Sequence, residues 1–454
     1  MRRSEAIVAV RVAAAVAVSS GALVARPLNA QSAGGVSALS ATGIADVDSA
    51  NAARLAWGRG VRALNSDDLA TARAEITRAA GAWPAQPTYI WGRAFVAALA
   101  HDTNDVVASL DRYAGYGIGR SVGTDTLFIA YRGLPAFDRI AAALEANLAP
   151  TVRSRVVATM PDSTFWPEGV DYDPRTGRYY LASVRHRNVA ELRADGTVRE
   201  LWPRDLPNIG AVLGVRVDAA RGVLWATTSG IRQMEGFAPA DTSIAALLRI
   251  RIADGAIERR WDVAPSALGH VLGDLAVGPR GDVYVTDSSE PFVYRLRPGA
   301  DTLERITSPL FRSLQGVAPT PDGRTVYLAD YSHGLLALEL ATGVVRRLDD
   351  APGSTAVGCD GIALDARGAI IAVQNGVSPA RVTRFVIDRS RRRVVSATLV
   401  DRNLTVADEP TIGTMVRGRF VYVANSQWEK YDDDGTRKRG VPLTAPVLLE
   451  LRLP

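Results

Sequence analysis

Cysteine is almost absent from this chain of 454 residues, in which Cys359 is the only one. One thiol cannot build a disulfide framework or a cysteine-ligated zinc site, so both are excluded. Lysine is nearly as rare: only Lys430 and Lys438 occur among 53 basic residues, which leaves 53 − 2 = 51 arginines. An excess of arginine this large is typical of a GC-rich genome.

The positive charge of the chain is not gathered into a basic face. The formal net charge is +5, but the arginines are scattered among 48 acidic residues. The densest basic run, residues 389–393, falls between two strand-like segments and is interpreted as a solvated turn. Because nucleic-acid binding needs a clustered basic surface, nucleic acid is not an expected partner.

Short motifs that mark common active sites are also missing. The chain has no nucleophile elbow, no phosphate-binding glycine loop and no HExxH zinc motif. Asp-Asp-Asp-Gly at 432–435 carries acids as a calcium loop does, but it lacks the register and terminal glutamate of an EF-hand. A solvated hairpin turn is expected there, so any site must be assembled from distant residues.

Only one apolar run is long enough to concern membranes, and it lies near the start. Arg2 and Arg3 precede an apolar run over 12–25. This pattern predicts a secretory signal peptide over residues 1–30 and a periplasmic or secreted protein. The run is shorter than the roughly 20 residues that span a bilayer, but arginines at both of its ends leave an uncleaved anchor as the alternative. We expect no membrane span in the mature chain.

Residues 40–150 have a helical hydrophobic period and contain a repeat. Trp-Gly-Arg-Gly at 57–60 recurs 34 residues later as Trp-Gly-Arg-Ala at 91–94. A helix–turn–helix period of 34 residues resembles tetratricopeptide repeats, which present surfaces for partner proteins. The alternative is an unrelated helical lid packed on the next domain.

After residue 150 the period becomes alternating, and a second repeat begins. Six units share a turn glycine followed by an apolar strand that ends in a small polar residue, at 177–183, 222–228, 281–287, 323–330, 368–375 and 418–425. Each unit is surrounded by further short strands, as in propeller blades. The last unit lacks an outer strand, which residues 153–159 can supply. The sequence therefore predicts a mainly β fold, a six-bladed β-propeller over 151–454 closed by strand 153–159, preceded by a small α-helical domain.

Residues just before the inner strands of such a ring meet at one mouth of its central channel. Here they are Glu168, Leu213, Gly273, Gln315, Asp360 and Pro410, with Asp274 and Glu409 beside them. Carboxylate and amide oxygens suit a hard divalent cation. Further oxygen candidates end the second strands: Asp287, Asp330, Asn375 and Asn425.

Three of these segments resemble the regucalcin/gluconolactonase family, the senescence marker protein type. They are Pro-Glu-Gly at 167–169, Gln-Gly-Val at 315–317 and Cys-Asp-Gly-Ile at 359–362. Members are six-bladed propellers that hold a divalent cation, usually calcium, at the pore mouth, and several hydrolyse lactones. The resemblance implies Glu168, Gln315 and Asp360 as metal ligands, with Asp360 also the catalytic base that activates water.

The chain departs from the family pattern at two of these points. Gln315 stands where the family has asparagine, and Gly273 where relatives carry a substrate-contacting asparagine. Asp274, His270 and Asn375 are the candidates for substrate contact. His270 is either a base facing the pore, as in related arylesterase propellers, or a polar loop residue.

Two classes of function follow from this sequence. The first is an exported hydrolase of lactones or esters that uses a divalent cation, with Ca²⁺ expected, and a small molecule bound at the pore mouth. The second is a non-catalytic propeller that binds a ligand or protein while the helical repeats dock a partner. In that alternative, Glu168 and Asp360 only bond loop N–H groups and hold blades together.

Overall fold

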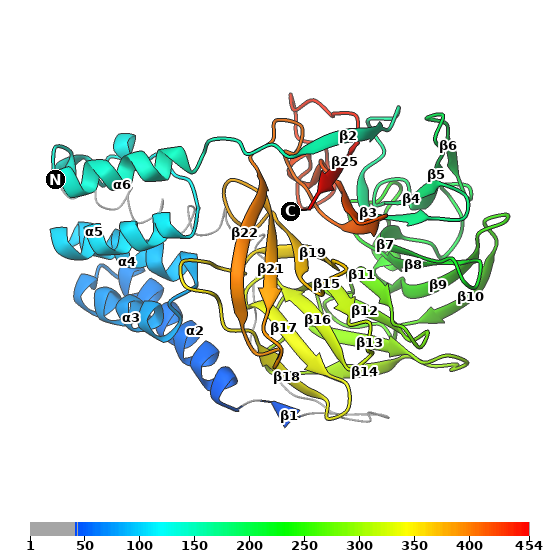
Figure 1. The fold of residues 1–454 in the computed structure, drawn as a ribbon, viewed down its shortest axis with the longest axis horizontal. Helices are drawn as coiled ribbons and strands as arrows, with labels where there is room; N and C mark the ends of the chain where they lie inside the picture. The colour runs from blue at the N-terminus through cyan, green and yellow to red at the C-terminus, as the bar shows by residue number, and fades with distance from the viewer. Residues whose placement is uncertain (1–40, 43, 454) are drawn as a thin grey trace.

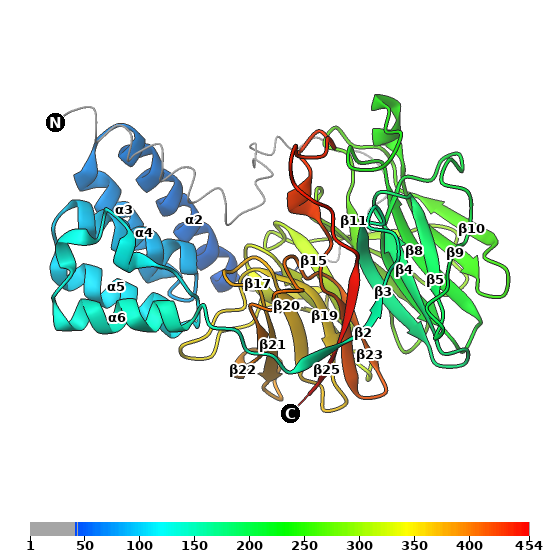
Figure 2. The same cartoon turned by 90° about the horizontal axis from the view of Figure 1, so that it is seen from above.

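The chain changes from helices to strands near residue 150. The computed structural model describes residues 41–42 and 44–453, so the predicted signal peptide at 1–30 lies outside the described residues. Figures 1 and 2 show a helical region beside a ring of twisted sheets. The helices are α2 (Ile44–Asn65), α3 (Leu69–Ala82), α4 (Pro87–Leu99), α5 (Thr103–Gly115) and α6 (Pro135–Ala146).

The helices start where side chains can cap them. The carboxylates of Asp68 and Asp102 accept hydrogen bonds from backbone N–H groups at the starts of α3 and α5, at 3.0 and 3.1 Å. These two helices begin 34 residues apart, at 69 and 103, which matches the sequence repeat. Gly60 lies where a Cβ would come within 2.6 Å of the Ile76 side chain, so glycine lets α2 and α3 approach closely. Similarity to tetratricopeptide repeats stays a prediction.

The strands form six antiparallel four-stranded sheets, as the repeat predicts, and a two-residue strand, β1 (Ala41–Thr42), extends the fourth blade in parallel with β18. The strands of the first five blades follow, each blade from its inner strand outward. Blade one is β3 (Pro167–Asp173), β4 (Arg178–Ser183), β5 (Asn188–Leu192) and β6 (Val198–Glu200), and blade two is β7 (Ala211–Asp218), β8 (Val223–Ser229), β9 (Ala245–Arg251) and β10 (Ile257–Asp262). Blade three is β11 (Leu272–Val277), β12 (Val283–Asp287), β13 (Phe292–Leu296) and β14 (Glu304–Thr307), blade four is β15 (Leu314–Pro319), β16 (Thr325–Asp330), β17 (Gly334–Glu339) and β18 (Val344–Arg347), and blade five is β19 (Cys359–Leu364), β20 (Ile370–Gln374), β21 (Arg381–Ile387) and β22 (Val394–Arg402).

The sixth blade joins the two ends of the propeller. It consists of β23 (Gly413–Val416), β24 (Arg419–Val423), β25 (Val447–Arg452) and, on the outside, β2 (Ser154–Thr159). Strand β2 pairs antiparallel with β25, from Ser154 opposite Leu451 to Thr159 opposite Val447. Because a strand that precedes blade one completes blade six, the ring has no open edge between its first and last blades.

Apolar side chains between neighbouring blades form the core of the ring. The cluster between blades one and two includes Leu224 and Leu248, both fully buried, and similar clusters lie between the following blades. Burial of each such side chain contributes about 1.5–3 kcal/mol. The strands are covered on both faces, which explains why β8 and β16 are apolar along most of their length.

The helical region packs against loops of blades four and five, on the side where the inner strands begin (Figure 2). Arg381 of β21 donates a hydrogen bond to the carbonyl of Tyr116 at 2.7 Å. The ring of Trp83 lies 5.2 Å from that of His333. The helices therefore flank the channel mouth. None of the helices in the described part of the chain has the length and apolar character that crossing a bilayer requires.

Candidate functional site at the pore mouth

Five inner strands carry the same irregularity at the mouth of the channel. The register of β3, β7, β11, β15 and β19 shifts across three residues at the start of each strand, from the first strand residue in four of them and from the second residue in β7. The candidate residues predicted to precede these strands therefore lie inside the bulges. A bulge re-aims side chains, and here the repeated bulge places one residue per blade at the mouth.

Glycines within these bulges let neighbouring inner strands come close. A Cβ on Gly169 would lie 2.5 Å from the carbonyl oxygen of Leu213. A Cβ on Gly361 would lie 2.6 Å from the Cα of Ile412. The glycine that follows each acid thus lets its strand lie close to the beginning of the next inner strand around the channel.

Glu168 and Asp360 are buried acids with little countercharge. Their exposed fractions are 8% and 7%. Burial, and then repulsion from Asp360, raises the pKa of Glu168 well above its usual range. Burial also raises the pKa of Asp360 to about 7, although a hydrogen bond from Asn375 opposes the increase. Because the two carboxylates repel one another, ionisation of both is unfavourable unless a cation lies close to them.

Asn375 contacts Asp360 directly and has an amide oxygen that points to no donor among the described residues. Its Nδ2 donates to Asp360 Oδ2 at 2.6 Å and to the carbonyl of Pro410 at 2.9 Å. Its Oδ1 is buried and has no hydrogen-bond partner among the described residues. A buried amide oxygen without a donor is costly, so this oxygen is available to accept a hydrogen bond or to coordinate a cation.

The side chains of the other candidates at the ends of second strands are already hydrogen-bonded to nearby protein groups. Asp287 Oδ1 accepts from three backbone N–H groups, and Asp330 accepts from four. Asn425 bonds to Thr444 and to backbone groups near it. Of these residues, Asn375 alone is bonded to a mouth carboxylate.

Asp274 lies deeper and has a partner that the sequence did not indicate. Arg216, on inner strand β7, donates to both Asp274 oxygens at 3.2 and 3.4 Å. Burial raises the pKa of Asp274 even though Arg216 opposes the increase. An arginine in mid-strand gave no sequence signal beyond its position on an inner strand.

Two further groups at the mouth come from blade six. Trp428, in the connection between β24 and β25, donates its indole N–H to Glu168 Oε2 at 2.7 Å. Burial raises the pKa of Glu409 to about 8, while the N–H of Glu429 donates to its carboxylate at 3.1 Å. Sequence reasoning missed Trp428; the one available signal was the long connection that carries it.

Gln315 and His270 are both engaged by protein groups. Gln315 Oε1 accepts from Ser288 Oγ at 3.3 Å, and its Nε2 donates to Ser313 Oγ at 3.2 Å. His270 contacts Asp287 through Nδ1 at 2.6 Å and the carbonyl of Ala264 through Nε2 at 2.9 Å. With both ring nitrogens occupied, His270 fits the polar loop interpretation better than that of a base facing the pore.

The acids and amides of the mouth have the chemistry of a hard-cation site. Glu168, Asp360 and the free Oδ1 of Asn375 are oxygen donors, and a cation would relieve the repulsion that now favours protons on the acids. The described residues contain no group of three His, Cys, Asp or Glu side chains placed to hold an ion. The fit therefore depends on two carboxylates supplemented by amide oxygens.

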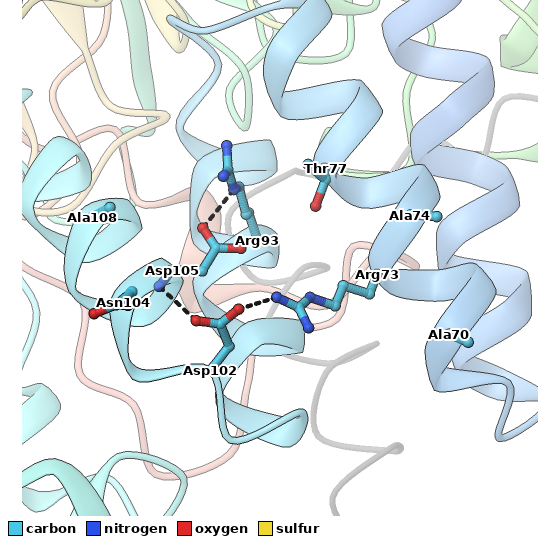
Figure 3. A pocket seen from close by; sticks show the side chains of 9 residues that line it. All are labelled: Ala70, Arg73, Ala74, Thr77, Arg93, Asp102, Asn104, Asp105 and Ala108. Carbon is cyan, nitrogen blue, oxygen red and sulfur yellow. Dashed lines mark hydrogen bonds and ion pairs between the residues drawn. The ribbon is translucent and has the colours of Figure 1, made fainter.

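The helical region has a cavity of its own, about 730 Å³, between α3 and α5 (Figure 3). Ala70, Ala74 and Ala108 leave the space free. Arg73 reaches across it to an ion pair with Asp102, and Arg93 pairs with Asp105 at 2.8 Å. Because its charges already pair with one another, this cavity shows no unsatisfied group that calls for a ligand.

Comparison with known proteins places the propeller in a family. The family model described as SMP-30/Gluconolactonase/LRE-like region matches residues 166–406, more than half of the chain. No curated protein matches the chain.

Solved structures with a similar ring include three of bacterial origin. Regucalcin from Agrobacterium tumefaciens, a calcium-binding protein, has 17% identity over 65% of this chain and 93% of its own, with a TM-score of 0.43. A gluconolactonase from Xanthomonas campestris has 18% identity over 67% and 92%, with a TM-score of 0.42. Virginiamycin B lyase from Staphylococcus aureus has 14% identity over 59% and 80%, with a TM-score of 0.42. The family match rests on the sequence segments and not on these distant structures: the chain belongs to the SMP-30/gluconolactonase/LRE-like family.

Proposed function

We propose that this protein is a cation-dependent hydrolase of lactones, with its active site at the pore mouth. The observation that carries the proposal is the buried pair Glu168 and Asp360 beside Asn375, whose Oδ1 has no hydrogen-bond partner in the described part of the chain. Membership of a family that includes gluconolactonases supports it.

Glu168, Asp360 and Asn375 would hold the cation, and Gln315 could add its amide oxygen once Ser288 releases it. Calcium is the expected ion because all of these donors are oxygens. When bound, the cation would polarise the lactone carbonyl and acidify a water molecule.

Asp360 is the group we assign as general base. Its carboxylate is buried at the mouth and is oriented by a hydrogen bond from Asn375 to one of its oxygens. It would take a proton from the attacking water as the water oxygen bonds to the carbonyl carbon. The ring C–O bond then breaks, and the ring oxygen leaves as a hydroxyl after regaining a proton, so the product is a hydroxy acid.

Asn375 and Trp428 would position these two acids. Asn375 is bonded to one oxygen of Asp360, which fixes the carboxylate orientation. Trp428 does the same for Glu168 and favours its charged form, because the hydrogen bond lowers the pKa of Glu168. Asp274 is paired with Arg216, so this ion pair would have to open before Asp274 could contact a substrate.

The test is to measure hydrolysis of a panel of sugar lactones with a pH-stat, in the presence and in the absence of a chelator. We expect turnover that is lost with EDTA and restored by calcium. Absence of turnover on every lactone, with a correctly folded protein, would favour the binding propeller of the alternative interpretation.

We also propose that the chain is exported and that residues 1–30 are removed. The sequence pattern at 1–30 is the support for this proposal. N-terminal sequencing of the protein from the periplasm or medium would test it; a mature chain that still begins at Met1 would contradict it.

A further inference from the structure

A second cavity lies beside the acidic mouth, over blades one and two. It encloses about 230 Å³. Three arginines and one acid line it, with one aromatic, one aliphatic and two neutral polar or imidazole side chains: Arg185, Arg204, Arg437, Glu235, Tyr431, Leu443, Thr164 and His186. Its walls come from loops of blades one, two and six, which only the closed ring brings together.

Two of these arginines have no acidic partner. Arg204 is paired with Glu200 at 2.9 Å and with Asp162 at 3.5 Å. Arg185 donates to the carbonyl of Gln233 at 3.1 Å, and Arg437 to that of Val441 at 2.9 Å. In the described part of the chain, no carboxylate forms an ion pair with either guanidinium.

Glu235 is the remaining acid of the lining. Its backbone N–H donates to the carbonyl of Arg185 at 2.9 Å, so its carboxylate is not consumed by that contact. Glu200 and Asp162, the acids that contact Arg204, are not part of the lining. The lining itself therefore has three guanidinium groups and one carboxylate, whereas the adjacent mouth is lined by acids.

An aromatic layer joins this cavity to the mouth. Tyr431 pairs with Arg437 across a hairpin, and its ring stacks on Trp166 with centroids 4.4 Å apart. Trp166 is fully buried and contacts Trp428 edge-on at 4.9 Å. The indole of Trp428 is bonded to Glu168, so Tyr431, Trp166 and Trp428 form a continuous chain of three aromatic rings from the cavity to one of the proposed catalytic acids.

We propose that this cavity binds an anionic group, a carboxylate or a phosphate, carried by the lactone substrate. The inference rests on the proposed function and names its substrate class. Guanidinium groups bind carboxylate and phosphate oxygens through paired hydrogen bonds. The cavity is smaller than the roughly 300–1,000 Å³ of a whole-ligand pocket, so it takes one end of a substrate whose carbonyl lies at the mouth. Tyr431 and Leu443 supply an apolar wall for the carbon chain.

Calorimetric titration of the protein with glucuronate, glucose 6-phosphate and glucose tests the proposal without turnover. We expect glucose to bind at least about tenfold more weakly than the better of the two anions, since hydrogen bonds to charged groups contribute that much. The relative affinities of glucuronate and glucose 6-phosphate identify carboxylate or phosphate as the preferred group.

Four variants locate the binding. R185Q and R437Q each weaken binding of the preferred anion about tenfold, whereas E235Q strengthens it because the one opposing charge is removed. R439Q, which changes an exposed arginine two residues from Arg437, leaves binding unchanged and serves as the matched control. Equal affinity for glucose and both anions, or unchanged affinity in both R185Q and R437Q, would overturn the proposal.

Kinetics separates this proposal from the hydrolase proposal. In R437Q we expect the KM for 6-phosphoglucono-δ-lactone to rise about tenfold while that for glucono-δ-lactone stays constant. Hydrolysis of both lactones with no such difference would overturn the anion site and leave the hydrolase standing. Arginine-dependent anion binding without hydrolysis of either lactone would support the anion site and overturn the hydrolase.

Discussion

Glu191 at the rim of blade one and Glu168 at the mouth of the same blade are both buried, yet their surroundings are opposite. Glu191 accepts hydrogen bonds from Arg178, Arg193 and Arg199 at 2.8–3.2 Å. These bonds outweigh the effect of burial, so the pKa of Glu191 is lowered. Glu168 has one indole N–H and a second acid nearby, and its pKa is raised.

This difference distinguishes buried acids that stabilise the folded state from buried acids that destabilise it. A buried acid with partners contributes to stability, whereas a buried acid without countercharge opposes folding. The rim of the propeller repeats the first arrangement at Asp282 with Arg295 and at Asp365 with Arg384. Acids of the second kind gather at the mouth, where perturbed pKa values are typical of functional sites.

Among substitutions that remove a mouth or rim acid, the largest expected effect is on lactone turnover. D360N removes the proposed base and should lower lactone turnover by about 10²–10⁴-fold. The free energy of unfolding should not fall, because the repulsion with Glu168 is removed. Steady-state hydrolysis and urea unfolding measure the two quantities. D365N, a rim variant, is the control that should retain turnover; turnover of D360N within threefold of the unchanged protein would contradict the assignment.

The second-largest expected effect is on stability. Here loss of the rim acid should be harmful, whereas loss of the mouth acid should not be. E191Q leaves three arginines without their acid and should lower the free energy of unfolding by about 2 kcal/mol, since a charged hydrogen bond contributes that much. E168Q should leave it unchanged or raise it. Urea unfolding at pH 7 compares them, and equal losses in the two variants would show that the mouth and rim acids do not differ.

The third effect is on the pH dependence of stability without metal. Asp360 and Glu409 have pKa values raised to about 7 and 8, so the folded state holds protons that the unfolded chain has lost. Their contribution is present below the ordinary carboxyl range near 4 and is lost as the pH rises to about 8. Glu191 has a lowered pKa, so its contribution is lost only as the pH falls below that range. Thermal melting in EDTA should therefore show E191Q converging with the unchanged protein at low pH.

Calcium should reverse the loss of stability at high pH. Because the ion competes with protons for Glu168 and Asp360, it should raise the melting temperature more at pH 8 than at pH 5. An equal increase at both pH values would mean that the ion binds elsewhere.

The smallest effect is that of the indole hydrogen bond. W428F removes the donor that favours ionised Glu168, so protons compete better and calcium binding at pH 7 should weaken about threefold to tenfold. W225F is a suitable control because the indole nitrogen of Trp225 has no hydrogen-bond partner among the described residues. Equal changes in calcium affinity in W428F and W225F would argue against a positioning role for Trp428.

The architecture of the ring was predictable because its repeat is local. Each glycine turn and apolar strand follows from a few adjacent residues, and the segment at 153–159 was identified by the strand that the last blade lacked. The predicted closing strand at 153–159 differs from β2, which spans Ser154–Thr159, by one residue. The acids of 432–435 form the predicted hairpin turn, closed by Gly435 N–H to Asp432.

The mouth was predictable only for residues that occupy the repeated bulge. Glu168 and Asp360 could be found because each precedes a glycine at the start of an inner strand. Trp428, Arg216 and the cavity arginines could not, because their roles depend on loops of different blades that meet only after the ring closes. Sequence spacing carries no information about which loop of blade six crosses onto blade one.

Calcium titration by calorimetry at pH 7, on the unchanged protein and on E168Q and D360N, tests the central claim most directly. E304Q, at the rim, is the control. We predict one calcium per chain in the unchanged protein and in E304Q, and at least about tenfold weaker binding in both mouth variants. Calcium binding that is unchanged in both E168Q and D360N would contradict the account.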